Sequence, residues 1–169
     1  IRQTSEGGYI VAGYSLSFGS STDIWVLKLD SAGGITWQKT YGGNALEQAH
    51  SIEQTSDGGY LVAGNTQSFG AGGKDILLFE LDATGAVIWQ KTYGGSGDDY
   101  AYAITRTSPD EGYSITGPSA SFGEDSSSDV LLLKLDHTGS IFGCDIVCAG
   151  GLNSADTSIT AFPVSILWT

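Results

Sequence analysis

Short apolar runs separated by turn-forming residues recur along the whole chain. The clearest set is AHSIEQT (49–55), YLVAGNT (60–66), DILLFELD (75–82) and VIWQKTY (87–93). These runs are rich in Val, Ile, Leu, Tyr and Trp, and none extends to a helical length with a 3.6-residue period. The pattern predicts four short antiparallel strands in this part of the chain and almost no helix.

Gly, Asp and Ser separate these runs and predict the turns. Between the first two runs lies SDGG, in which we expect Asp57 and Gly58 to supply the positive φ angles of a two-residue hairpin turn. Asp30, Asp82 and Asp136 begin the turn that follows each third strand. Their side chains are expected to accept hydrogen bonds from the backbone N–H groups of that turn.

The same hairpin is written more than once. QTSDGGYLVAG at residues 54–64 nearly repeats QTSEGGYIVAG at residues 3–13, and a third, more divergent copy begins at Ile104. The period is about 52 residues, which is in the range of propeller repeats. We therefore divide residues 1–150 into three units, approximately 1–43, 44–95 and 96–150. Residues 151–169 follow as a C-terminal tail or closing strand.

Four antiparallel strands in a unit of this length are typical of a β-propeller blade. The sequence thus predicts an all-β fold, a β-propeller with about three four-stranded antiparallel blades. Because propellers have about four to eight blades, three form only a partial ring. We expect the ring to be completed by further blades of a longer chain or by a homo-oligomer. The chain contains no Met and opens within a repeat, which favours the longer chain.

Two strings in the repeat carry a family resemblance. LDSAGGITW and LDATGAVIW, which end at Trp37 and Trp89, resemble the tryptophan-docking repeat of pyrroloquinoline-quinone-type propellers. The resemblance implies that each Trp packs between blades. The whole unit is also similar to tandem repeats of secreted bacterial and archaeal propeller proteins, which implies an extracellular or cell-surface location. The third copy has Gly143 at the docking position, which suggests that its blade is the last.

The net charge limits the classes of partner. With 19 acidic and 7 basic residues the formal charge is −12, so nucleic-acid phosphates and anionic lipid headgroups would be repelled. No apolar run approaches the roughly 18 to 20 residues that a membrane-spanning helix needs, so we expect no membrane insertion. Cations and basic surfaces are better candidates.

Acidic residues gather on the loops of one predicted rim. Asp98, Asp99, Glu124 and Asp125 are the candidate metal ligands, because clustered carboxylates in Gly-rich loops suit Ca²⁺. The alternative interpretation is that these are solvated surface acids. Asp23, Asp75 and Asp129 recur at the start of the third strand of each repeat. We expect their carboxylates to accept hydrogen bonds from backbone N–H groups of the loop that precedes that strand.

Catalytic constellations are harder to find. The two histidines, His50 and His137, belong to an inner strand and to a turn on the opposite rim, so they should not meet. Cys144 and Cys148 would supply at most two zinc ligands, and they can form a disulfide only if a turn brings them together. No serine lies in a GxSxG context. The sequence predicts no catalytic residue, and no cofactor other than Ca²⁺.

Three functions are consistent with these features. The first is a non-catalytic extracellular scaffold or interaction module, stabilised by Ca²⁺ on the acidic rim, with a protein or glycan partner. The second is a carbohydrate-binding propeller lectin, because aromatic residues recur at matching positions in the repeats. The third is an enzyme, either a hydrolase or a quinoprotein.

Overall fold

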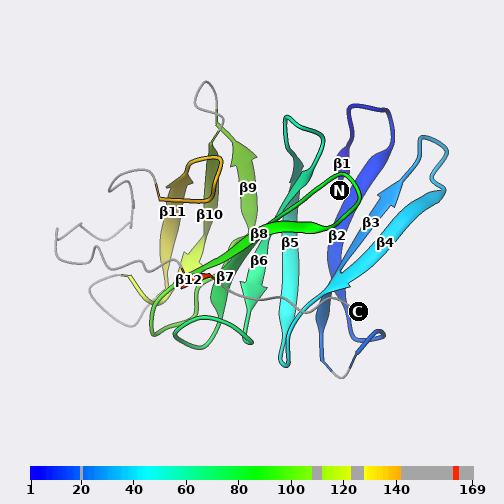
Figure 1. Ribbon diagram of the computed structural model, residues 1–169. Coiled ribbons are helices and arrows are strands. Elements are labelled where there is room, and N and C mark those ends of the chain that lie inside the picture. The colour runs from blue at the N-terminus through cyan, green and yellow to red at the C-terminus, as the bar shows by residue number, and fades with distance from the viewer. Residues whose placement is uncertain (20, 108–111, 123–127, 142–161, 164–169) are drawn as a thin grey trace.

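The computed structural model describes residues 1–19, 21–107, 112–122, 128–141 and 162–163, and these residues contain strands and turns but no helix. Three antiparallel sheets lie side by side in chain order (Figure 1). Sheet 1 contains β1 (Arg2–Gln3), β2 (Tyr9–Ser15), β3 (Asp23–Leu29) and β4 (Ile35–Tyr41). Sheet 2 contains β5 (Glu47–Gln54), β6 (Tyr60–Thr66), β7 (Asp75–Leu81) and β8 (Val87–Tyr93). Sheet 3 contains β9 (Ala103–Arg106), β10 (Tyr113–Ser119) and β11 (Asp129–Leu135).

The prediction of an all-β fold built from repeated antiparallel sheets is confirmed. The four strands of sheet 2 coincide with the predicted runs to within two residues at each end. The two-residue strand β12 (Phe162–Pro163) pairs with β8 and adds a fifth strand to this sheet. The described sheets do not close into a ring, so the propeller stays a proposal. Gly143, Cys144 and Cys148 lie outside the described residues.

The hairpin turns differ from the prediction in one respect. The backbone N–H of Gly58 donates to the carbonyl of Thr55 at 3.2 Å, and Thr55 N–H donates to Gly59 at 3.0 Å. The loop therefore has three residues, and Gly58 alone among the glycines of this turn has a positive φ, of 89°. The expected two-residue turn is therefore wrong. A three-residue loop that ends in a glycine bulge matches the twist of the paired strands and needs a positive φ at one residue, whereas a type I′ two-residue turn needs it at two.

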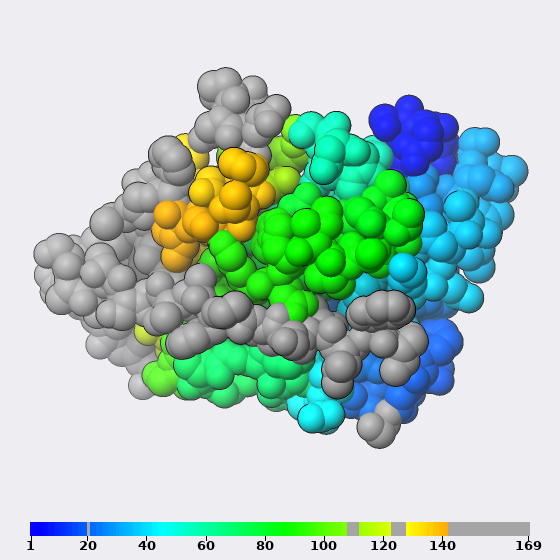
Figure 2. Space-filling view, viewed as in Figure 1, coloured from blue at the N-terminus to red at the C-terminus, as the bar shows by residue number. Residues whose placement is uncertain are grey.

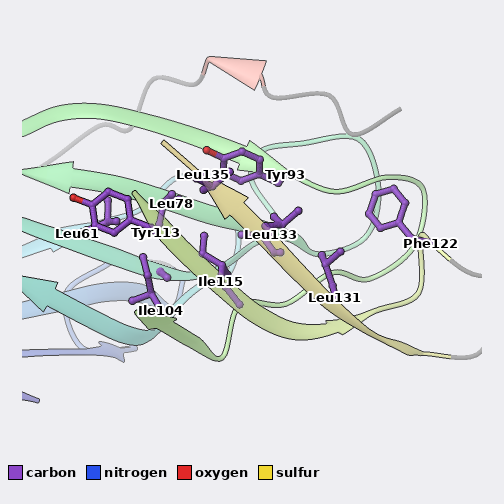
Figure 3. Packing of buried hydrophobic residues seen from close by; sticks show 13 residues of the cluster. Leu61, Leu78, Tyr93, Ile104, Tyr113, Ile115, Phe122, Leu131, Leu133 and Leu135 are labelled. Atoms are coloured by element: carbon purple, nitrogen blue, oxygen red, sulfur yellow. The ribbon is translucent and has the colours of Figure 1, made fainter. Parts of the chain in front are cut away.

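Both faces of sheet 2 are buried, which explains its continuous apolar runs. Every residue of β6 and β7 is buried, and alternate side chains point toward opposite neighbours. One face, with Phe79 and Leu77, packs against Ile24 and Val26 of sheet 1. The other, with Leu61, Leu78 and Tyr93, packs against sheet 3 (Figure 3). The hydrophobic core therefore consists of two seams between successive sheets.

Equivalent residues join successive sheets at the edge that carries the turns after β7 and β11. The hydroxyl of Tyr41 donates to the carbonyl of Gly85 at 2.7 Å, and the hydroxyl of Tyr93 donates to that of Gly139 in the next sheet. Trp37 and Trp89 lie over the same two glycines, where an added methyl group would come within 3.1 Å and 2.6 Å of the indole rings. Figure 2 shows the resulting contact of the green β8 surface with the orange surface near residue 139.

Candidate functional site

The acidic rim is described in part, because Glu124 and Asp125 lie outside the described residues. Asp98 is exposed and accepts a hydrogen bond from the backbone N–H of Lys74 at 2.9 Å. Asp99, its neighbour, is 0% exposed. The described residues contain no group of three or more His, Cys, Asp or Glu side chains that could hold a metal ion. The four-carboxylate calcium site stays a prediction.

Both oxygens of Asp99 accept hydrogen bonds from the protein. Its Oδ2 accepts from the backbone N–H of Gly95 at 2.9 Å and from the Ser121 hydroxyl at 2.5 Å, and its Oδ1 accepts from the Ser119 hydroxyl. Glu47 occupies the same position at the first seam and accepts from the backbone N–H groups of two loops and from Thr66. These carboxylates therefore tie the start of each inner strand to the rim loops.

A second carboxylate lies beside each of these buried acids. An added methyl group at Gly94 would overlap Oδ1 of Asp75 and lie 2.7 Å from Oδ2 of Asp99. Burial raises the pKa of Asp75, and the charges of Asp99 and Asp98 raise it further, against hydrogen bonds from backbone N–H groups that lower it. Burial and the charge of Glu47 raise the pKa of Asp23 in the same way at the first seam. Two carboxyl groups therefore lie close together at each seam: both are buried at the second seam, whereas Asp23 at the first seam is half-buried.

Replacing Asp75 by Asn is expected to stabilise the protein at neutral pH. An acid whose pKa is raised by folding contributes stability that is present below its unfolded pKa and is lost as pH rises through its folded pKa. The charge of Asp75 therefore costs stability at pH 7, and Asp75→Asn should raise the free energy of unfolding by on the order of 1 kcal/mol. Urea unfolding across pH checks this, and the gain should disappear below about pH 4.

The turn acid Asp82 provides a control of opposite sign. Its Oδ1 accepts from the backbone N–H groups of Ala86 and Thr84 at 2.9 and 2.8 Å, as predicted for this turn, and these bonds lower its pKa. Asp82→Asn should therefore destabilise the protein at neutral pH; the difference should begin to shrink at about pH 4, close to the unfolded pKa, and vanish once the pH lies below the lowered pKa of the folded protein. Equal effects of both substitutions would contradict the assignment of the Asp75 effect to a buried charge pair.

The two histidines belong to separate sites, as predicted. His50 lies on β5, where the pairing with β6 shifts register between Ala49 and Ser51. Its Nε2 is 2.7 Å from Oδ1 of Asn65, and its ring makes an edge contact with Tyr102, with centroids 5.2 Å apart. His50 therefore links β5 to the segment that precedes β9 across the second seam.

His137 lines a pocket at the opposite rim, between sheets 2 and 3. The pocket encloses about 320 Å³ and is formed by turn residues 55–57 and 137–138, together with Glu80, Trp89 and Tyr113. The indole N–H of Trp89 donates to Oε2 of Glu80 at 2.5 Å. Burial raises the pKa of Glu80, and this N–H bond opposes the increase. This seam pocket therefore brings acidic, imidazole and aromatic side chains from two different sheets together.

Sequence reasoning missed this pocket, although a signal was present in the repeat. Glu80 stands where the first and third copies have Lys28 and Lys134. A reversal of charge at a matched repeat position marks a place where one repeat differs from the other two. The pocket residues come from two different repeats, so their proximity follows only from the way in which the sheets stack.

Known proteins give no further assignment. No protein-family model matches the sequence, and no curated protein matches it either.

Proposed function

We propose that this chain is a non-catalytic interaction scaffold, a run of β-propeller blades whose successive sheets are joined by a repeated seam. The observation that carries the proposal is the recurrence of the seam. Tyr41 and Tyr93 bond the next turn in the same way, and Glu47 and Asp99 close the same loops. A unit that makes the same contacts on both of its faces can be extended by further units.

The open face of sheet 1 supports this proposal. Tyr9, on that face, is 36% exposed, whereas its counterpart Tyr60 in sheet 2 is 1% exposed. Val11, Trp25 and Leu27 also belong to the open face and are half-buried, and no described sheet covers them. The corresponding residues of sheet 2 pack against Ile24 and Val26 of the preceding sheet. The occupant that fits the open face is therefore another blade of the same kind.

Self-association of the 169-residue chain tests the proposal. In sedimentation velocity measurements at increasing concentration, we expect reversible association through the open face. Leu27→Asp should reduce it, because a charge at the centre of the face must lose water on docking. Ala32→Asp, on an exposed turn of the same sheet, is the control with the same charge change and should associate as the parent does. A chain that stays monomeric at high concentration would contradict docking of a blade on this face.

Extracellular location and stabilisation by Ca²⁺ belong to the same proposal and rest on the family resemblance and the acidic rim. The lectin alternative predicts equivalent sugar sites in every blade, and binding on a glycan array would support it. The enzyme alternative, a hydrolase or a quinoprotein, requires activity or a bound chromophore in the purified protein. The calcium-stabilised scaffold would be favoured if the purified protein showed no enzymatic activity and bound no glycan on the array. Its melting temperature should then fall when a chelator is added.

A further inference from the structure

We infer that the seam pocket between sheets 2 and 3 binds a primary ammonium group, supplied by a small alkylamine or by a lysine side chain of a peptide. This inference deepens the proposed function, on which it rests, by naming what one seam of the scaffold would take. It is carried by a comparison of the two seams, because the first seam contains an ammonium group of its own at the equivalent place.

In the first seam, the ammonium group of Lys28 is buried among acceptors. Its Nζ donates to Oγ1 of Thr4 at 3.0 Å and lies 2.7 Å from Oε1 of Glu6. Lys28 is 7% exposed, and its hydrogen bond lowers the pKa of Glu6 to about 2. The first seam thus shows how a threonine and a carboxylate of this turn hold an ammonium group.

The second seam keeps the acceptors and lacks the ammonium group. Thr55 and Asp57 stand at the positions of Thr4 and Glu6, and Glu80 replaces Lys28. Without a lysine to bind, the hydroxyl of Thr55 donates to Oδ1 of Asp57 at 2.5 Å. The substitution converts a filled ion pair into an acidic pocket, because Glu80 adds a third acceptor where the cation stood.

Glu80 is placed to bind a cation from the pocket. It is 9% exposed, and within the described residues its carboxylate accepts one hydrogen bond, from Trp89 to Oε2. Oε1 has no donor there. A buried carboxylate is costly unless it is paired, so a ligand ammonium that donates to Oε1 and to Asp57 would relieve this cost. The Trp89 and Tyr113 rings, which also line the pocket, provide apolar surface for the alkyl chain.

Isothermal titration with simple probes tests the inference. We expect n-butylammonium and N-acetyl-lysine methylamide to bind the 169-residue chain, and uncharged n-butanol not to bind. Preference for the lysine derivative would indicate a peptide source, and preference for n-butylammonium would indicate a free amine. Equal binding of butanol, or no binding of either amine, would overturn the inference. Binding of Ca²⁺ in place of the amines would overturn it as well.

Two substitutions at Glu80 separate binding from folding. Glu80→Gln keeps an acceptor for Trp89 and removes the charge, so amine affinity should fall roughly tenfold or more. Glu80→Lys reproduces the first seam, with an internal ammonium group for Thr55 and Asp57. This variant should lose amine binding and melt at a higher temperature. Asp98→Asn, on the other rim, removes one surface charge as a control and should leave affinity unchanged. Unchanged affinity in Glu80→Gln would overturn the inference.

The affinity should also depend on pH in a stated direction. The ionisable groups that face Glu80 are Asp57 from the β5–β6 turn, His137 from the turn after β11, and Tyr113 from β10, all of which line the pocket. Lys91 lies beyond Trp89, with its Nζ 5.8 Å from the ring centroid. Burial raises the pKa of Glu80, and protonation of Glu80 removes the negative charge that would bind the cation, so amine binding should weaken as the pH is lowered through the range in which Glu80 takes up a proton.

The two proposals fail in distinguishable ways. Loss of self-association in Leu27→Asp tests the stacking of blades and does not involve the pocket. If the chain associates as expected but binds no amine, the inference about the pocket is wrong and the scaffold proposal stands. If amines bind and Glu80→Lys abolishes binding while the chain stays monomeric, the pocket is a ligand site and docking of a further blade is wrong.

Discussion

Replacing Gly64 by Ala is expected to destabilise the protein by about 3 kcal/mol, because the added methyl group has no space. It would overlap the carbonyl oxygen of Gln48 on β5 and lie 2.9 Å from the Cα of Ala49. These are backbone atoms, which cannot move away without breaking the pairing of β5 with β6. Gly117 has the same relation to Tyr100 on the next inner segment, so Gly117→Ala should show a similar loss. Chemical denaturation measures both.

Gly13 is the matched control for this experiment. It occupies the same repeat position, but an added methyl group would find nothing within 4 Å. Since Ala is favoured over Gly inside a strand by roughly 0.5–1 kcal/mol, Gly13→Ala in the 169-residue chain should be neutral or slightly stabilising. A large loss at Gly13 together with a small one at Gly64 would contradict the close approach of the inner strand as the reason for the glycine.

The second large effect is expected at Asp99: the Asp99→Ala substitution should lower the free energy of unfolding of the protein by about 3 kcal/mol. Three donors would then be left without their acceptor inside the protein: the backbone N–H of Gly95 and the hydroxyls of Ser119 and Ser121. Unsatisfied buried donors carry the full cost of desolvation. Thermal or urea unfolding of the variant measures the loss.

The neighbouring Asp98 separates this structural role from a calcium site. Asp98 is exposed and has hydrogen bonds to Lys74 N–H and, at 3.4 Å, to the Tyr100 hydroxyl. Asp98→Ala should therefore cost less than about 1 kcal/mol. If Asp99 is structural, the difference between the two variants is the same in Ca²⁺ and in EDTA. If both form a calcium site, added Ca²⁺ raises the melting temperature of the parent and of neither variant.

Local sequence signals predicted most of the strands because they depend on nearby residues. Runs of β-branched and aromatic residues, ended by Gly and Asp, locate strands by propensity and turn chemistry alone. The turn acids Asp30, Asp82 and Asp136 bind backbone N–H groups as predicted. The turn type was wrong because sequences such as SDGG suit both two-residue and three-residue loops, and the choice depends on the twist of the paired strands.

The candidate site could not be predicted in the same way. Asp98 and Asp99 are adjacent and look alike in sequence, yet one is exposed and the other fully buried. Strand alternation directs neighbouring side chains to opposite sides, but only the packed seam shows which side faces donors. The pocket depends on Glu80 and His137, which are far apart in the chain and meet because sheet 3 stacks on sheet 2.

The repeat, the strands and the two-faced apolar pattern of the central unit can be inferred from the amino-acid sequence alone, since each follows from local propensity and from periodicity over a few residues. Which polar residues are buried together depends instead on how the sheets pack. Asp75 with Asp99, and Glu80 with Asp57, become neighbours only when sheets or loops pack. Burial and electrostatic coupling depend on distances through space, and those distances exist only once the seams have formed.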